Sequence, residues 1–303
     1  AYNTLPFFGR KGHESVLDAS EKMIREMRNV IKIVDKTGIS ESYSHFIVFY
    51  TRTIIHYLAF YLELLKQIQS VLNPSTLSVT ANSQEPGQLE LNSQLSYLGP
   101  VTNSFANAHN IGYEHACTVK NKSETVFLSF GKSILLNIGG KTLTWIMQKK
   151  LQREARKKTV VLAFERTYNM PRLIDEIINS GDIIVYLNSG KNDFFPILKG
   201  EFIGLNGLQF GSEKNDPMFE NSIKESLNSL KSSAALKNYF YCGVDLWCWI
   251  EPWLDKVLVP ALRKLNVQTA QLSKLLKKVT PRLVLSQHAL GLGGSLGELC
   301  LKR

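Results

Sequence analysis

The sequence is short of cysteine and of acidic residues, and these shortages exclude several classes of protein. Only four of the 303 residues are cysteine, and they are widely scattered. A chain of this length buries a core without covalent staples, so a disulfide scaffold is excluded and an intracellular, reducing compartment is favoured, with the cytoplasm as the first expectation. The 44% apolar content also excludes a disordered or collagen-like chain.

The chain has no long uninterrupted hydrophobic run. Phe46–Leu65 has the length of a membrane span, but Arg52, His56 and Glu63 interrupt it. Charged side chains are costly in the bilayer, whereas a core helix tolerates a few polar positions. We therefore expect a central buried helix and no transmembrane span.

The chain also lacks a complete phosphate-binding loop. Gly131-Lys132-Ser133 and Gly140-Lys141-Thr142 resemble the end of such a loop, which needs a further glycine five residues upstream. Val126 and Leu135 occupy those positions. Both triplets are therefore interpreted as turns between short strands.

A nucleophile elbow is only partly present. Gly293–Gly297 fits the pattern G-x-S-x-G around Ser295, but this motif requires an acid and then a histidine downstream. The nearest histidine, His288, lies upstream. A flexible glycine-rich tail is the preferred interpretation, and a serine hydrolase that uses Ser295 with His288 stays a third alternative for the function.

Metal-ligand spacing is incomplete as well. Cys242 and Cys248 are too far apart for a zinc knuckle, and His109, His115 and Cys117 lack a fourth ligand nearby. We expect no metal, no cofactor and no catalytic activity.

Hydrophobic periodicity, caps and turn residues predict an α+β fold that is predominantly helical. A capped helix is expected to open at Asp216-Pro217, and Pro260 is expected to kink or split the last long helix. The expected helices cover 15–36, 42–72, 148–158, 171–179, 217–231 and 252–278, and the expected strands cover 125–130, 133–138, 141–145, 159–165, 182–188 and 194–205.

These elements suggest three regions. Residues 1–115 form a helical N-terminal lobe with a long surface excursion at 73–110, which holds at most one short helix near 89–98. Residues 116–210 form a small β-rich middle that contains a basic helix. Residues 211–303 form a helical C-terminal lobe with an apolar, glycine-rich tail.

Aromatic residues concentrate between Tyr239 and Trp253. Aromatic side chains can stack on nucleic-acid bases, but this block lies in an acidic part of the chain. We therefore interpret it as core or as a subunit interface.

The net charge of +10 is segregated along the chain. Residues 146–172 carry eight basic and two acidic side chains, and 256–303 carry nine and one, whereas 173–255 carry six and twelve. The first basic block contains Lys149, Lys150, Arg153, Arg156, Lys157 and Lys158, and the second contains Arg263, Lys264, Lys274, Lys277, Lys278 and Arg282. Solvated helix faces are the plain interpretation of such runs.

The functional interpretation is a non-enzymatic, self-assembling protein that binds nucleic acid, RNA in the first instance, through the phosphate backbone, as a nucleocapsid or coat protein does. The two basic blocks, except Arg282, are the predicted phosphate contacts. A homo-oligomer is expected because the acidic stretch can meet a basic block of another copy. The alternative is a membrane-associated or scaffold subunit of a larger complex that uses a basic amphipathic C-terminal helix.

Overall fold

A computed structural model of the chain describes residues 9–79, 98–115, 149, 153–165, 171–188, 202–204, 216–278, 280–285 and 291–302. Most of these residues are in helices, and the strands among them are short. The predominantly helical α+β class predicted from the sequence is confirmed. The three strands predicted between 125 and 145 lie outside the described residues.

The chain divides into two compact units, each built from two separate stretches. The first unit comprises 1–122 and 216–264, and the second comprises 123–215 and 265–303. The first unit therefore joins residues of the expected N-terminal lobe with the first part of the expected C-terminal lobe. The three-lobe division itself stays a prediction.

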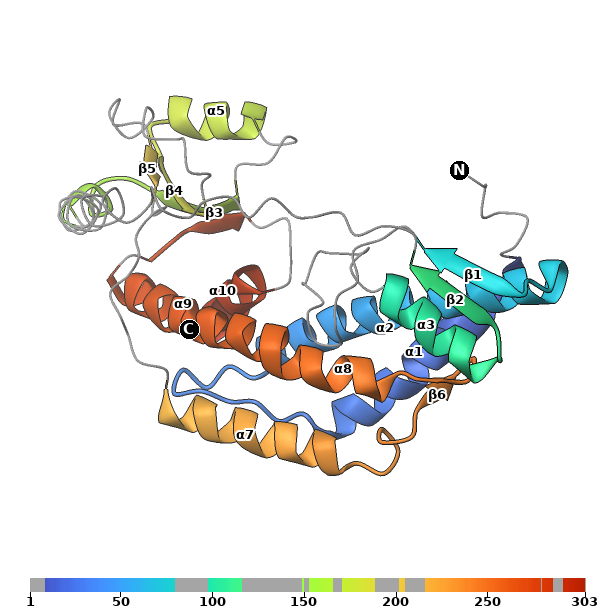
Figure 1. Cartoon of the computed structure of the whole chain (residues 1–303). Helices are drawn as coiled ribbons and strands as arrows, with labels where there is room; N and C mark the ends of the chain where they lie inside the picture. The colour runs from blue at the N-terminus through green and yellow to red at the C-terminus, as the bar shows by residue number, and fades with distance from the viewer. Residues whose placement is uncertain are drawn as a thin grey trace, which may run out of the picture. The chain divides into compact units, whose positions relative to one another are not determined.

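The first unit is a helical assembly with two small two-stranded sheets (Figure 1). Strands β1 and β2 pair in parallel, and β6 and β7 form an antiparallel hairpin. Its elements are α1 (Arg10–Val30), α2 (Glu41–Leu72), β1 (Thr76–Val79), α3 (Leu98–Ala108), β2 (Gly112–His115), α7 (Pro217–Ser232), β6 (Phe240–Tyr241), β7 (Val244–Asp245), α8 (Trp247–Trp253), the π-helix η2 (Leu254–Leu258) and the start of α9 (Val259–Lys278).

Helix α2 is the predicted core helix, and the prediction is confirmed. The side chains of one broad face are buried, including Ile55, Leu58 and Leu62. The helix ends at Asn73, which adopts a left-handed conformation (φ 43°) before Pro74, as the Asn-Pro pair predicted. Among the described helices, none is both long enough and apolar enough to cross a membrane.

The first helix ends earlier than its periodicity predicted. It stops at Val30, and the following residues extend along α7, where Ser226 and Ser222 accept hydrogen bonds from the main-chain N–H groups of Lys32 (3.0 Å) and Val34 (3.2 Å). Ile31 and Ile33 alternate into the core. The prediction of helix to residue 36 is wrong because tertiary hydrogen bonds replace the helical ones in this segment.

The predicted surface excursion at 73–110 is wrong for its described part. Residues 76–79 form β1, and α3 buries Val101 and Phe105 completely. The segment is rich in Ser, Asn and Gly, which are typical of loops, so its composition did not predict these packed elements. The short helix expected near 89–98 lies outside the described residues apart from its last position.

The capped helix at Asp216-Pro217 is confirmed as α7, where the Asp216 carboxylate accepts a hydrogen bond from the N–H of Met218 at 3.1 Å. The predicted split near Pro260 also occurs. The chain changes to a π-helix just before Pro260, and the N–H of Val259 bonds to the carbonyl of Leu254, five residues back. Because proline lacks an N–H and crowds the preceding turn, a wider turn accommodates it.

The second unit contains a four-stranded sheet in which every described pairing is parallel, with strand order β5-β4-β3-β8. The second part of α9 also belongs to this unit. The remaining elements are β3 (Val160–Glu165), α5 (Pro171–Asn179), β4 (Ile183–Asn188), β5 (Phe202–Gly204), β8 (Leu283–Leu285) and α10 (Leu292–Leu301).

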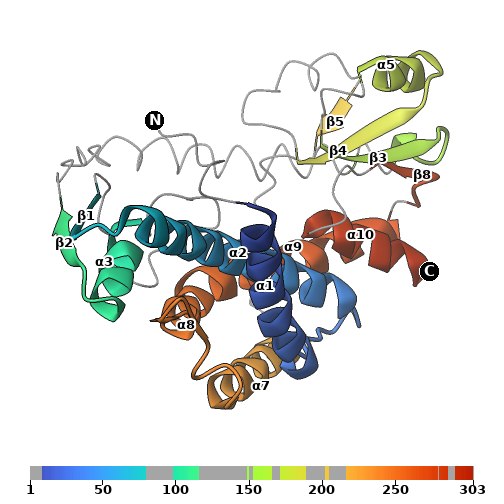
Figure 2. The same cartoon turned by 90° about the vertical axis from the view of Figure 1, so that its right-hand side faces the viewer.

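Helices lie on both sides of this sheet. Ile177 and Ile178 of α5 pack against Val161, Ile184 and Leu285, which share one face through the strand register. Val160, Leu162 and Ile183, which alternate with these residues along the strands and belong to the other face, are buried too. Helix α10 lies on the side of the sheet opposite α5 (Figures 1 and 2). A sheet covered on both faces explains why its strands are near-continuous apolar runs.

The expectation of a flexible C-terminal tail is wrong in the described residues. Leu283–Leu285 form β8, and Leu292–Leu301 form α10. Leu296 and Leu299 lie three residues apart on one helix face and are buried. Their burial offsets the conformational entropy that the glycines of this segment lose on folding.

Candidate nucleic-acid interface

The first basic block lies immediately before strand β3. Lys149, Arg153 and Glu154 are helical and the chain turns over Ala155–Lys157, so Arg156 is not on the helical stripe expected for 148–158. In this turn the N–H groups of Lys157 (2.9 Å) and Lys158 (3.0 Å) both bond to the Glu154 carbonyl. The exposed residues of this block are Lys149, Arg153, Arg156, Lys157 and Lys158, and Lys150 lies outside the described residues.

The second basic block is divided between the two units. Arg263 and Lys264 belong to the first unit, whereas Lys274, Lys277 and Lys278 belong to the second. The guanidinium of Arg263 holds the Glu220 carboxylate through Nε (3.0 Å) and Nη2 (2.9 Å), so its charge is already matched within the protein. Lys264, Lys274 and Lys277 are exposed, and the side chain of Lys278 lies outside the description.

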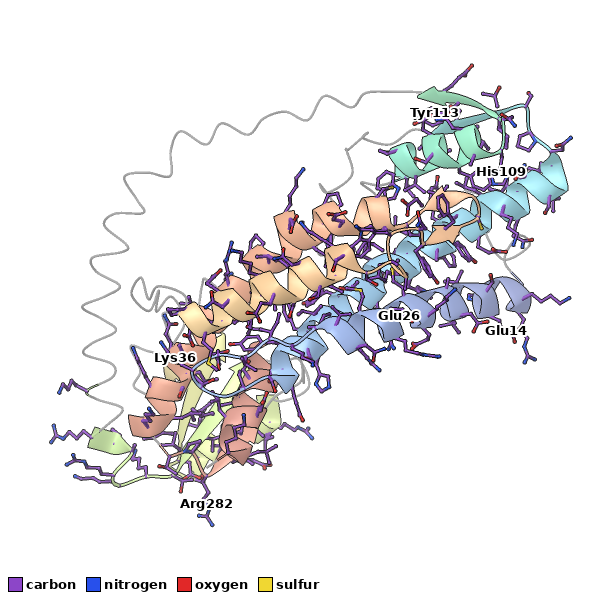
Figure 3. The ribbon with its side chains drawn as sticks, turned by 90° about the horizontal axis from the view of Figure 1, so that it is seen from below. Glu14, Glu26, Lys36, His109, Tyr113 and Arg282 are labelled. Atoms are coloured by element: carbon purple, nitrogen blue, oxygen red, sulfur yellow. The ribbon has the colours of Figure 1, made fainter. Side chains whose placement is uncertain are left out.

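Strand pairing brings the two blocks together in the second unit. Strand β8 runs parallel to β3, and the N–H of Arg282 donates to the carbonyl of Val160 at 2.9 Å. Parallel strands begin at the same edge of a sheet, so the residues before β3 and those before β8 converge. Figure 3 shows the Arg282 side chain pointing away from the ribbon at this edge.

We call the exposed basic residues before these two strands the basic edge. The acidic side chains described at this edge of the sheet are fewer: Glu154, which lies 3.8 Å from Lys158, and Asp182, which precedes the neighbouring parallel strand β4. The two segments before β3 and β8 therefore carry a net positive charge that is exposed to solvent. The basic edge consists of Arg153, Arg156, Lys157, Lys158, Lys277 and Arg282.

The convergence depends on a strand that the sequence analysis did not predict. Strand β8 is short and begins two residues after Pro281, and its Leu-Val-Leu run lies in the stretch interpreted from the sequence as a tail. An apolar run with a β-branched residue that follows a proline was the available signal. Arg282 itself was noted in the second block but not among the predicted contacts.

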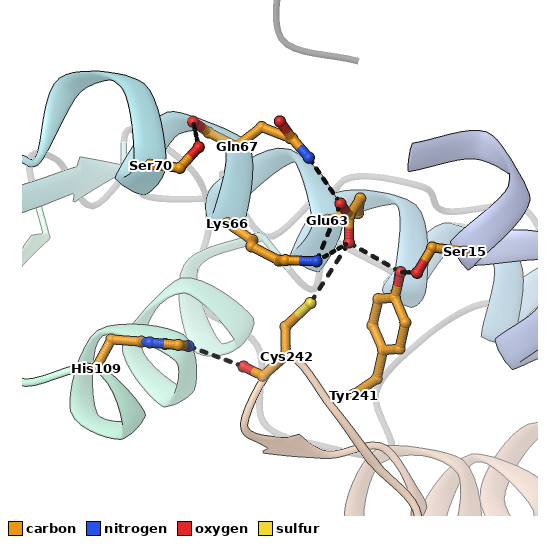
Figure 4. A network of polar contacts seen from close by, with 8 residues as sticks. All are labelled: Ser15, Glu63, Lys66, Gln67, Ser70, His109, Tyr241 and Cys242. Carbon is orange, nitrogen blue, oxygen red and sulfur yellow. Dashed lines mark hydrogen bonds and ion pairs between the residues drawn. The ribbon is translucent and has the colours of Figure 1, made fainter. Parts of the chain in front are cut away.

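A second polar cluster lies in the first unit, around Glu63 of α2 (Figure 4). The Glu63 side chain is only 3% exposed. Its carboxylate accepts hydrogen bonds from Gln67 Nε2 (2.8 Å), Lys66 Nζ (3.2 Å) and the Tyr241 hydroxyl (3.0 Å), with Cys242 Sγ at 3.7 Å. In the sequence, Glu63 stands out only as an interruption of an apolar run.

The cluster ties the β6–β7 hairpin to helices α1 and α2. Because the Tyr241 hydroxyl donates its one hydrogen to Glu63, the Ser15 hydroxyl donates to Tyr241 (2.8 Å). Cys242 and Gly243 at the hairpin turn have φ of 49° and 79°, as a two-residue type I′ turn requires. His109 Nε2 lies 3.0 Å from the Cys242 carbonyl oxygen and supports the turn.

The protonation states in this cluster suit a structural role. Burial raises the pKa of Glu63, but the hydrogen bonds from Gln67, Lys66 and Tyr241 outweigh it and hold this pKa below its ordinary value. Burial, with the Glu63 charge, raises the pKa of Cys242 to about 12 and also raises that of Tyr241. Near neutral pH the cluster therefore holds one carboxylate and protonated donors, and it contains no thiolate nucleophile.

Replacing Glu63→Gln is expected to lower the free energy of unfolding by about 1–3 kcal/mol at pH 7, because buried donors lose a charged acceptor. The pKa of Glu63 is lower in the folded chain than its ordinary 4.5, so its contribution is complete above that value and is lost as pH falls through the folded pKa. Urea unfolding at pH 7 and pH 3 measures the difference. The matched control is Glu14→Gln on the exposed surface of α1. If Glu63→Gln lowers the free energy of unfolding by the same amount at both pH values, the result contradicts a charged Glu63 that stabilises the fold.

The other sequence candidates are placed as follows. Within the described ranges, no group of three or more His, Cys, Asp or Glu side chains is arranged to hold a metal ion, and Cys117 lies outside those ranges. Ser295 is completely buried inside α10, unlike an exposed nucleophile at a strand-to-helix turn, and His288 is not described.

The aromatic block is mainly core, as one of its two interpretations predicted. Trp247, Trp249, Trp253 and Tyr239 are buried, whereas Phe240 is 61% exposed. The tryptophan rings are thus unavailable for stacking on bases.

Comparisons with protein-family models, with curated proteins and with solved structures find no match to this chain.

Proposed function

We propose that the chain binds nucleic acid through its phosphate backbone at the basic edge of the second unit. The observation that carries this proposal is the main-chain bond between Arg282 and Val160, which joins two basic segments more than 100 residues apart in the sequence. Exposed lysine and arginine side chains neutralise phosphates and release counterions without reading base sequence. RNA and DNA share this chemistry, and RNA is the first ligand to test.

The structure offers less support for binding to a membrane surface. A basic amphipathic helix lies on a bilayer only if its apolar face is free to enter the lipid. In α9 the apolar stripe of Leu262, Leu265, Leu272 and Leu276 is already buried in the protein. These four leucines are therefore not free to enter a bilayer beside the basic residues, as the membrane alternative requires.

Self-assembly remains the second part of the proposal. Its support is charge segregation: α5 exposes Asp175 and Glu176, and the basic edge exposes the opposite sign. Electrostatic pairing between copies weakens with salt, so light scattering in 50 mM and 500 mM salt tests it. A mass per particle that is unchanged and monomeric at both salts contradicts it. An intracellular, reducing location, with a nucleocapsid-like role, stays a prediction from composition.

The binding proposal is tested with a fluorescent 12-nucleotide oligouridylate and the matching oligothymidylate, titrated with the full chain at several salt concentrations. We expect log K to fall linearly with log salt, by about 0.7 per phosphate contact for single strands. Neutral and anionic liposomes serve as the competing membrane probe. Affinity that ignores salt, or capture by anionic liposomes but not by either oligonucleotide, contradicts the proposal.

A further inference from the structure

Strand β8 is a weakly anchored edge of the four-stranded sheet. It contains only three residues, its sole described sheet neighbour is β3, and Leu283 is 46% exposed. Short strands with exposed side chains belong to the parts of a protein that open at low free-energy cost. The partner strand β3 lies more than 100 residues earlier in the chain, so loop-closure entropy also opposes the pairing.

Electrostatic repulsion acts on the same pair of strands. Lys157 and Lys158 precede β3, and Lys277 and Arg282 precede β8, and all four side chains are exposed. Of these four side chains, Lys158 forms an ion pair with Glu154 of its own segment, at 3.8 Å. The like charges of Lys157, Lys158 and Arg282 therefore approach one another when β8 pairs with β3, and among the described residues no ion pair joins the two segments.

We infer that a nucleic-acid backbone bound at the basic edge clamps β8 onto β3, so that binding and completion of the sheet are coupled. This inference rests on the proposed function. The docked arrangement presents both halves of the basic edge to one phosphate chain, whereas an undocked β8 leaves only the half before β3. A ligand that binds one arrangement more tightly shifts the population toward it, and the docked sheet in turn raises the affinity.

Hydrogen–deuterium exchange of the full chain, with and without the 12-nucleotide oligouridylate, tests the coupling. We expect amides of β8 and of Arg282 to exchange at least about tenfold more slowly when the oligonucleotide is bound. Amides in the middle of α2, in the first unit, serve as the internal control and are expected not to change. Anisotropy measured on the same samples reports whether the oligonucleotide is bound.

The variant K277Q/R282Q separates the two parts of the inference. Without ligand its β8 amides are expected to exchange more slowly than in the parent chain, because the repulsion is removed, and the oligonucleotide is expected to add little further protection. The matched variant K224Q/K256Q, on exposed positions of the first unit, is expected to behave like the parent. Bound oligonucleotide with unchanged exchange in β8 overturns the clamp but leaves the proposed function standing. Absence of binding by anisotropy overturns the proposed function itself.

Discussion

Reversing the charge of both halves of the basic edge is expected to weaken RNA binding at least about 100-fold at 50 mM salt. The variant K157E/K158E/K277E/R282E removes four phosphate contacts and places negative charges against the backbone. Because each lost contact lowers the log–log salt slope by about 0.7, the slope is expected to fall by nearly 3. Anisotropy titrations over a salt series measure both quantities, and circular dichroism verifies that the fold is intact.

The first unit supplies a control of equal charge. Lys11, Lys224, Lys256 and Lys264 are exposed lysines there, and their replacement by glutamate lowers the net charge as much as the basic-edge variant does. We expect a loss of less than about tenfold, because long-range attraction falls but no phosphate contact disappears. An equal loss in both variants contradicts a localised site and points to overall charge. The control also tests Lys264, which the sequence analysis placed among the phosphate contacts.

Removing the Trp253 side chain is expected to give the largest loss of stability in the first unit. Trp253 is fully buried and is the largest of the completely buried side chains. Truncation of such a residue to alanine leaves a cavity and costs about 3–5 kcal/mol. Trp253→Ala is therefore expected to lower the urea midpoint by about 1–2 M, measured by far-ultraviolet circular dichroism.

The matched control lies in the same aromatic block. Phe240 is 61% exposed, so Phe240→Ala is expected to change the free energy of unfolding by no more than about 0.5 kcal/mol. Equal effects of the two substitutions contradict the assignment of the tryptophans to the core.

Elements with strong local signals were predictable from the sequence. Pro171 opens α5, Asp216 and Pro217 open α7, and Asn73-Pro74 ends α2, because caps and proline act within a few residues of where they stand. The failures depend on distant partners. The segment after Val30 leaves the helix to bond with α7, and β8 becomes a strand only beside β3.

The candidate site divides in the same way. Its charges follow from composition, since segregated lysine and arginine blocks are visible in the sequence. Which basic residues share one surface was not predictable, because it depends on a parallel pairing across more than 100 residues. The pairing brings Arg282 to the first block, and Lys277 lies five residues before it in the chain, whereas Arg263 remains in the first unit, paired with Glu220.

The stoichiometry of a short oligonucleotide tests most directly whether the two basic blocks form one site. Isothermal titration calorimetry of a hexauridylate into the full chain at 50 mM salt is expected to show one binding step with one oligonucleotide per chain. K157Q/K158Q and K277Q/R282Q are each expected to weaken that same step. Two oligonucleotides per chain, with each double variant removing only one of two independent steps, would contradict a shared basic edge.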